Sequence, residues 1–255
     1  MFDRLLVLAT AASAAFTPLA AAPAAAAPAA STAPATTRGV VVIVPGQSLG
    51  SLPYQPMAAE LRADGYTSLV LDLKGFDVAA DAASVAVAVD AAHTEYPGVP
   101  VALVTHSIGA LSGRYYLRDL GGADRIATYI AIGAPQYGSP GACGQSVGAE
   151  ICPDTRFMAD LNAGDDTPGP TTTYYSIRSE REWSDGRLDG GQCRITPFPT
   201  LGNGGVDHAL EPLLPAVLPQ VRGALAGVCD GEFVDEPDGA IDPRSTLFPN
   251  GVPYS

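Results

Sequence analysis

Val99-Pro-Val-Ala-Leu-Val-Thr-His-Ser-Ile-Gly109 is the stretch of this 255-residue chain that decides the fold. Its first seven residues form a valine-rich apolar run, which is typical of a strand buried on both faces of a parallel sheet. Residues 110–120 then predict a helix that ends at Gly121-Gly122. Ser107 therefore lies at a sharp strand-to-helix turn, as in the pattern G-x-S-x-G, with Thr105 in place of the first glycine. A helix N-terminus favours developing negative charge, so this turn predicts an exposed, reactive hydroxyl.

Strands and helices alternate on both sides of this turn. Further strands are predicted at 39–45, 67–72, 125–132 and 171–178, and further helices at 54–63, 77–96 and 213–226. In the helix over 77–96 we expect Val85, Val87 and Val89 to face the core. This alternation predicts an α/β fold with a mostly parallel central sheet and helices on both faces.

The two ends of the chain differ from its middle. Residues 1–30 predict a secretory signal peptide, cleaved between residues 20 and 30, because a weakly basic start precedes an Ala/Leu-rich run. A membrane anchor is the alternative, but Pro18 interrupts the run and no basic cluster follows. Residues 31–38 predict an Ala/Pro linker, 39–229 the folded domain, and 230–255 an acidic Pro/Gly-rich tail to which we assign no structure. We therefore expect an extracellular protein.

Charge and cysteine content narrow the function classes. The formal net charge of -13 disfavours binding to nucleic acid.

Four cysteines allow three disulfide pairings, and proximity along the chain favours Cys143–Cys152 and Cys193–Cys229. Zinc is the competing interpretation, but no pair is spaced C-x-x-C. The cysteines therefore indicate disulfides and agree with export.

Several segments together resemble a known family. The segments are Val44-Pro-Gly-Gln47, Thr105-His-Ser-Ile-Gly109, Ile132-Gly-Ala-Pro-Gln-Tyr-Gly-Ser139, Leu161-Asn-Ala-Gly-Asp-Asp-Thr-Pro-Gly169 and Gly205-Val-Asp-His208. Over about residues 39–225 the chain resembles the secreted bacterial lipases and esterases of the α/β-hydrolase fold, in particular the actinobacterial-type triacylglycerol lipases. It departs from them at Pro45-Gly46, where relatives usually carry His-Gly.

The resemblance implies a site of named residues. Ser107 would be the nucleophile and His208 its base, in the chain order serine, acid, histidine. The backbone N–H groups of Gln47 and Ile108 would form the oxyanion hole. Of the other two histidines, we expect His106 to be packed and structural, and His93 to be solvated or to cap a helix.

The acid of this site has two main candidates. Spacing after the strand that ends near Ser179 favours Glu182, whereas residue type and the trailing Leu188 favour Asp185. Glu180 is the third choice, and the alternative for all three is a solvated loop charge paired with an arginine. Cys143 to Cys152 lies where relatives carry a flap over the site.

The resemblance thus predicts a hydrolase of hydrophobic carboxylic esters that needs no cofactor or metal. We expect a monomer with a lipid or other hydrophobic ester as substrate, transient contact with a lipid interface, and no nucleic-acid partner. Two alternatives are an acyltransferase with the same residues and a non-catalytic binding protein on this scaffold. An acyltransferase would form a new ester with an added alcohol, whereas a hydrolase would release the acid. Labelling of the serine by a reactive probe would distinguish an enzyme from a non-catalytic binding protein.

Overall fold

A seven-stranded sheet organises the part of the chain that the structure describes. This computed structural model describes residues 37–195 and 204–247, so the predicted signal peptide lies outside the described residues, as does nearly all of the linker. The strands are β1 (Val40–Val44), β2 (Thr67–Val70), β3 (Val101–His106), β4 (Thr128–Ile132), β5 (Thr173–Ile177), β6 (Gln192–Ile195) and β7 (Gly231–Val234). Their order is β2-β1-β3-β4-β5-β6-β7, with β7 antiparallel to β6 and all other pairs parallel. The predicted α/β fold is confirmed.

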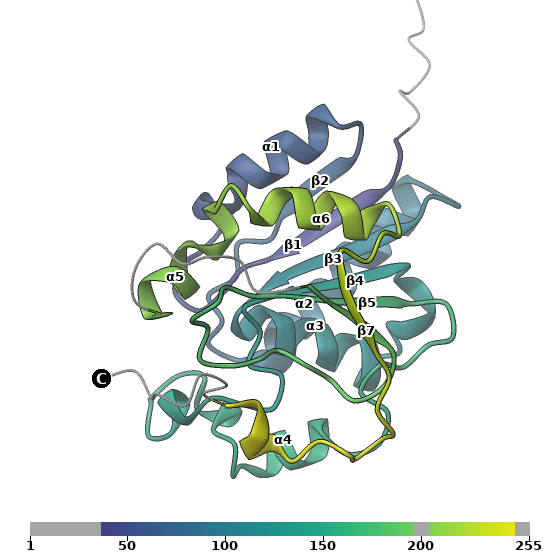
Figure 1. Ribbon diagram of the computed structural model, residues 1–255. Coiled ribbons are helices and arrows are strands. Elements are labelled where there is room, and N and C mark those ends of the chain that lie inside the picture. The colour runs from purple at the N-terminus through teal and green to yellow at the C-terminus, as the bar shows by residue number, and fades with distance from the viewer. Residues whose placement is uncertain (1–36, 196–203, 248–255) are drawn as a thin grey trace, which may run out of the picture. The chain divides into compact units, whose positions relative to one another are not determined.

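Helices cover both faces of the sheet (Figure 1). They are α1 (Gln55–Ala63), α2 (Val78–Glu95), α3 (Ile108–Asp119), α4 (Arg156–Leu161), α5 (Gly204–Leu210) and α6 (Val217–Leu225). Helices α2 and α3 pack on one face, and α1 and α6 on the other. Among these described helices, none is both long and apolar enough to cross a membrane.

The alternation of side chains along β1 divides the core into two layers. Val40, Val42 and Val44 pack with the layer of α2 and α3, whereas Val41 and Ile43 pack with that of α1 and α6. All five are buried, because successive residues of a strand point to opposite faces and helices cover both. This explains why β1 is a continuous apolar run rather than an alternating one.

Helix α2 corrects one expectation about the core. Val85 and Val89 are fully buried, but Val87 is 69% exposed. Residues four apart share a helix face, whereas a residue two positions away points to the opposite side. The expectation for Val87 was therefore wrong.

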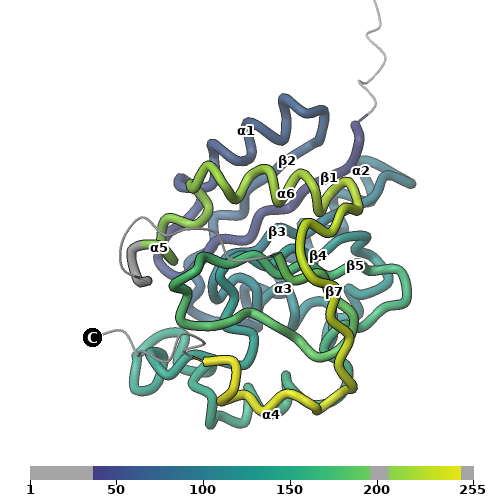
Figure 2. The backbone as a smooth tube through the Cα atoms, in the orientation of Figure 1, coloured from purple at the N-terminus to yellow at the C-terminus, as the bar shows by residue number. Residues whose placement is uncertain are grey.

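The C-terminal segment also differs from expectation, because residues 231–247 are structured. Strand β7 pairs with β6, and farther along the Glu236 carbonyl accepts the N–H of Gly190 at 2.7 Å. The yellow trace after β7 can be followed in Figure 2. The cause is the Cys193–Cys229 disulfide, which holds the start of this segment beside the otherwise open edge of β6.

Both expected disulfides are confirmed. Cys143 pairs with Cys152, and Cys193 with Cys229, with Cα–Cα distances of 4.8 and 5.6 Å. The first closes a short excursion after β4, and the second joins β6 to the residues that follow α6.

Candidate active site

Ser107 lies in a strained turn at the carboxyl end of β3. Its backbone has φ 54° and ψ -132°, a conformation that residues other than glycine rarely adopt, and α3 begins at the next residue. The turn requires a small residue two positions later, because a Cβ on Gly109 would overlap the carbonyl oxygen of Pro45. The strain holds the hydroxyl at the helix N-terminus, as the sequence pattern predicted.

Thr105, which departs from the G-x-S-x-G pattern, is accommodated by a second glycine. Its side chain is fully buried, and its hydroxyl donates to the carbonyl oxygen of Ile130 at 3.0 Å. A Cβ on Gly113 of α3 would lie 3.0 Å from the Thr105 methyl carbon. Because Gly113 has no side chain, the Thr105 methyl group fits at a position where the family pattern has glycine.

His208 joins Ser107 to a carboxylate. Its Nε2 lies 2.8 Å from Ser107 Oγ, and its Nδ1 lies 2.8 Å from Glu182 Oε2. Glu182 is buried beyond β5, and its Oε1 accepts the N–H of Trp183 at 2.9 Å. A carboxylate at Nδ1 leaves Nε2 free to accept a proton, so this arrangement can deprotonate the serine hydroxyl.

The other two acid candidates have different surroundings from those of Glu182. Asp185 is buried, but its carboxylate pairs with Arg187 at 3.2 Å and accepts the N–H of that residue. Glu180 is exposed. The structure therefore brings Glu182 to His208 and assigns Asp185 to an ion pair in the loop.

His106 and Tyr54 form a hydrogen-bonded chain behind these residues. The N–H of Gly46 donates to the Tyr54 hydroxyl at 2.8 Å. That hydroxyl donates to His106 Nδ1 at 2.7 Å, because the other ring nitrogen, Nε2, faces a carbonyl oxygen and must carry the proton of the neutral ring. His106 Nε2 then carries the ring proton and donates to the carbonyl oxygen of His208 at 2.8 Å. The expectation of a packed, structural His106 agrees with this geometry, whereas Tyr54 was not anticipated from the sequence.

Burial keeps this chain in one protonation state. Desolvation raises the pKa of the Tyr54 hydroxyl far above its usual value, so the hydroxyl keeps its proton. Burial, and then the charge that His208 can carry, hold the pKa of His106 well below its usual value, so this ring stays neutral. The third histidine, His93, bonds the carbonyl oxygen of Arg125 at 2.9 Å and has no part in the site.

Gln47 and Ile108 come together beside the serine. Gln47 follows β1 by three residues, and Ile108 opens α3. Gly75, at φ +64°, packs against both, because a Cβ there would lie 2.6 Å from Ile108 Cγ2 and 3.0 Å from Gln47 N. Within residues 37–195 and 204–247, neither backbone N–H donates to another group, so both can bind an oxyanion.

The disulfide-closed segment 143–152 lies over Gln47 and the start of α3, and we call it the flap. The Gln47 side chain donates to the carbonyl oxygen of Val147 at 3.4 Å, and the N–H of Gly148 donates to the carbonyl oxygen of Phe76 at 3.0 Å. Ile151 packs in one cluster with Ile108. The flap thus covers the residues around the serine.

His106, His208 and Glu211 form a group that could in principle hold a metal ion, with ligand atoms within 4.8 Å of one another. However, both ring nitrogens of His208 are engaged by Ser107 and Glu182, and both of His106 by Tyr54 and the His208 backbone. The donors are therefore committed to hydrogen bonds, and the cluster fits proton handling better than metal binding.

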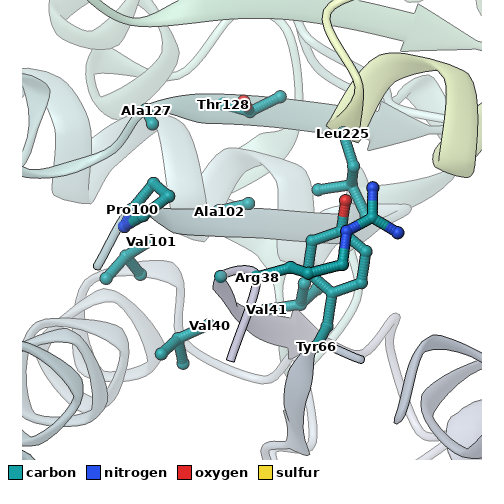
Figure 3. A pocket seen from close by; sticks show the side chains of 11 residues that line it. Arg38, Val40, Val41, Tyr66, Pro100, Val101, Ala102, Ala127, Thr128 and Leu225 are labelled. Atoms are coloured by element: carbon teal, nitrogen blue, oxygen red, sulfur yellow. The ribbon is translucent and has the colours of Figure 1, made fainter. Parts of the chain in front are cut away.

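A depression in the surface lies at the opposite end of the sheet from Ser107, at the amino ends of β1, β3 and β4 (Figure 3). Its lining is largely apolar, and the Arg38 guanidinium stacks over the Tyr66 ring at 4.8 Å. It holds no nucleophile paired with a base. The chemistry therefore belongs at the carboxyl ends of the strands, where open α/β sheets place their sites.

The family follows from this fold and a match to known proteins. The model of the alpha/beta hydrolase family matches residues 41–244, and the chain belongs to this family. A search of curated proteins finds no match.

Two solved structures illustrate the shared fold. The propeptide form of the Bacillus licheniformis lipase BlEst2 is similar with a TM-score of 0.60 and 18% identity, over 82% of this chain and 53% of that one. The product of the Listeria innocua gene lin2722 is similar with a TM-score of 0.52 and 14% identity, over 74% of this chain and 94% of that one. The chain thus spans about half the length of the BlEst2 structure.

Proposed function

We propose that this chain is a secreted serine hydrolase of hydrophobic carboxylic esters, a lipase or esterase similar to the actinobacterial-type triacylglycerol lipases. The observation that carries the proposal is the hydrogen-bonded line from Glu182 through His208 to Ser107, with 2.8 Å at each step. A buried carboxylate, an imidazole and a serine in a strained turn are the groups that nucleophilic acyl transfer requires.

The reaction would proceed through an acyl-enzyme. Ser107 Oγ attacks the ester carbonyl carbon while His208 Nε2 takes the hydroxyl proton. The N–H groups of Gln47 and Ile108 donate to the oxyanion of the tetrahedral intermediate. His208 then protonates the leaving alcohol, and a water molecule, deprotonated by the same nitrogen, releases the acid. Glu182 holds the imidazole in the required tautomer and stabilises the imidazolium.

The rim of the site supports an apolar acyl group. Phe76, Val147 and Leu210 are 43%, 37% and 37% exposed. They lie next to Gly75, in the flap and at the end of α5, respectively. Exposed apolar side chains on three segments that border the proposed catalytic residues favour a lipid or similar ester and transient contact with a lipid surface. The two disulfides are consistent with an extracellular protein. We propose that it acts as a monomer, without cofactor, metal or nucleic-acid partner.

A fluorophosphonate probe, which phosphonylates activated serines with loss of fluoride, tests this proposal. We expect one probe per chain on Ser107, and no labelling of Ser107→Ala, whose hydrolysis of a soluble ester should fall by about 10⁶. Ser84→Ala, on the exposed side of α2, is the matched control and should label as the unaltered chain does. Labelling of folded Ser107→Ala, or activity retained by it, would contradict the proposal.

A further inference from the structure

A second buried carboxyl lies next to the proposed catalytic acid. Glu211 follows His208 by about one helical turn and is fully buried. Its Oε1 accepts the backbone N–H of Ser179 at 2.6 Å. Its Oε2 is buried and receives no hydrogen bond from any residue that the structure describes. The mechanism above gives this titratable group no task.

The surroundings of Glu211 Oε2 are the proposed catalytic groups. The carboxyl of Glu182 faces it from the loop after β5, and the rings of His106 and His208 approach it from β3 and α5. Beyond β4, a Cβ on Gly133 would overlap Glu211 Oε2 and lie 3.1 Å from Glu182 Oε2. Gly133, at φ +53°, therefore leaves room for both carboxyls.

The charges around this pair require a proton. The partly buried Arg178, just after β5, is a cation whose charge interacts with both carboxyls. Burial lowers its pKa, and the charges of Asp185, Glu182 and Glu211 only partly offset this, so Arg178 is shared among three acids. His106 is neutral, so it compensates neither carboxyl. Burial, and then the charge of Glu182, raise the pKa of Glu211 well above its usual value. Two facing carboxyls in such a site share one proton rather than ionise together.

We propose that Glu211 is a positioning residue, whose protonated carboxyl donates a hydrogen bond from Oε2 to Glu182 and thereby holds Glu182 against His208 Nδ1. The proton supplies the interaction that Oε2 otherwise lacks. Glu182 is then held by Trp183, His208 and Glu211 together. The inference rests on the proposed function, because it assigns Glu182 and His208 their roles.

The proton shared by Glu211 and Glu182 makes turnover depend on pH. At alkaline pH Glu211 loses its proton, the hydrogen bond becomes a repulsion between two carboxylates, and Glu182 is displaced from His208. Turnover should therefore fall on the alkaline side with the apparent pKa of the pair.

Glu211→Gln and Glu211→Leu separate positioning from simple packing. The Gln amide keeps an acceptor for Ser179 and a permanent N–H donor for Glu182, so kcat/KM at neutral pH should change less than a few-fold and the alkaline decline should disappear. The Leu variant keeps the volume but has no donor, so turnover should fall by about tenfold or more. Glu60→Gln, on the exposed side of α1, is the matched control and should keep both the rate and the alkaline decline.

Infrared spectroscopy provides a readout that does not depend on activity. Spectra are recorded above the Asp189 pKa of about 7, where that second buried carboxyl is ionised. There the carbonyl stretch of a protonated, buried carboxyl should be present in the unaltered chain and in Glu60→Gln, and absent in Glu211→Gln. If that band survives in Glu211→Gln, or if folded Glu211→Gln loses turnover or keeps the alkaline decline, the proposal is wrong. If Ser107 fails to label, the proposed function is wrong, whereas the infrared test of the shared proton still stands.

Discussion

Glu182 and Asp185 are both buried, yet their partners differ in kind. Glu182 faces the ring of His208, whereas Asp185 faces Arg187 and, at 3.9 Å, Arg194. A carboxylate paired with arginines stabilises a loop, and one paired with an imidazole orients the ring. Replacing the carboxyl by its amide should therefore reduce turnover strongly at position 182 and only slightly at position 185.

We expect Glu182→Gln to reduce turnover of a soluble ester by up to about 10⁴ with no loss of melting temperature, because the amide stabilises neither the tautomer nor the imidazolium. Asp185→Asn should keep most of the activity per folded molecule and change the melting temperature little, because burial raises the pKa of Asp185 and so offsets its ion pair with Arg187, whose N–H the Asn oxygen can still accept. Kinetics and thermal unfolding of both variants check this. The reverse pattern would move the acid to Asp185.

Gly109 tests the close approach of β1 and α3 at the turn. Gly109→Ala should lower the free energy of unfolding by about 1–3 kcal/mol, because the added methyl group would overlap the Pro45 carbonyl and the backbones must separate. Gly141→Ala, whose Cβ would make only an ordinary contact at 3.5 Å, is the control and should stay within about 0.5 kcal/mol. Equal unfolding curves in urea for the two variants would contradict the packing argument.

At the scale of elements, one hydroxyl joins three segments around the site. Tyr54 ends the 3₁₀ turn Leu52–Tyr54, Gly46 follows β1, and His106 ends β3 and bonds the backbone of α5. This chain fixes the ring orientation of His106 and the spacing between the Gln47 loop and His208.

Tyr54→Phe should therefore lower turnover by about tenfold, since small misplacements of reacting groups are costly. It should also lower stability by about 1–2 kcal/mol, because the Gly46 N–H and His106 lose their partner. Tyr66→Phe, at the opposite end of the sheet, should change neither quantity. Wild-type turnover in Tyr54→Phe would show that the chain of hydrogen bonds does not position the site.

The two disulfides should differ in what they control. Replacing Cys193 and Cys229 by serine should cost about 1 kcal/mol more stability than replacing Cys143 and Cys152, because the loop that it closes is longer, 36 against 9 residues in separation. Only loss of the Cys143–Cys152 bond should raise KM, because the flap that it closes contacts Gln47. Denaturant titrations and steady-state kinetics on the two double variants check both statements. An unchanged KM without the flap disulfide would contradict its role in covering the site.

At the scale of the whole molecule, a buried polar network joins distant parts of the chain. Arg114 of α3 bonds the carbonyl oxygens of Gln136 and Leu161 and pairs with Asp166, which also accepts the Tyr137 hydroxyl. The carboxyl of Asp189 interacts with that of Asp166 and extends the network, because it also accepts the N–H of Gly239 in the C-terminal segment. Burial first, and then Asp166, raise the pKa of Asp189 to about 7.

This shift makes stability depend on pH in a defined direction. A raised pKa means that the folded chain binds the Asp189 proton more tightly than the unfolded chain does, so the contribution to stability is present at acidic pH. It is lost as pH rises from the unfolded value near 4 through about 7. The protonated Glu211 acts in the same direction.

We expect the urea midpoint of the unaltered chain to fall between pH 5 and pH 8, and Asp189→Asn to flatten this dependence, because the amide mimics the protonated carboxyl. Asp160→Asn, on the exposed side of α4, should leave the dependence unchanged. A variant at Asp189 with the same pH dependence as the unaltered chain would contradict the role of this carboxyl.

The sequence by itself determined the features that depend on residues close together in the chain: the strands, the turn at Ser107 and the disulfide pairing. The continuous apolar runs of β1 and β3 and the small residues around Ser107 predicted the parallel sheet and its turn, because residues within a few positions impose them. Proximity along the chain likewise favoured both disulfides correctly.

Tertiary structure alone decided which side chains of separate loops meet. Spacing favoured Glu182 and residue type favoured Asp185, and the sequence could not choose between them, because the path of the chain between β5 and β6 sets which of them faces His208. Strand β7 was missed because it is only four residues long and largely exposed, so it shows no alternation of buried and exposed positions, whereas the Cys193–Cys229 disulfide holds the chain beside β6. Glu211 was missed although it lies one turn beyond His208, since a glutamate near the surface of a helix reads as solvated until the fold buries it against another carboxyl.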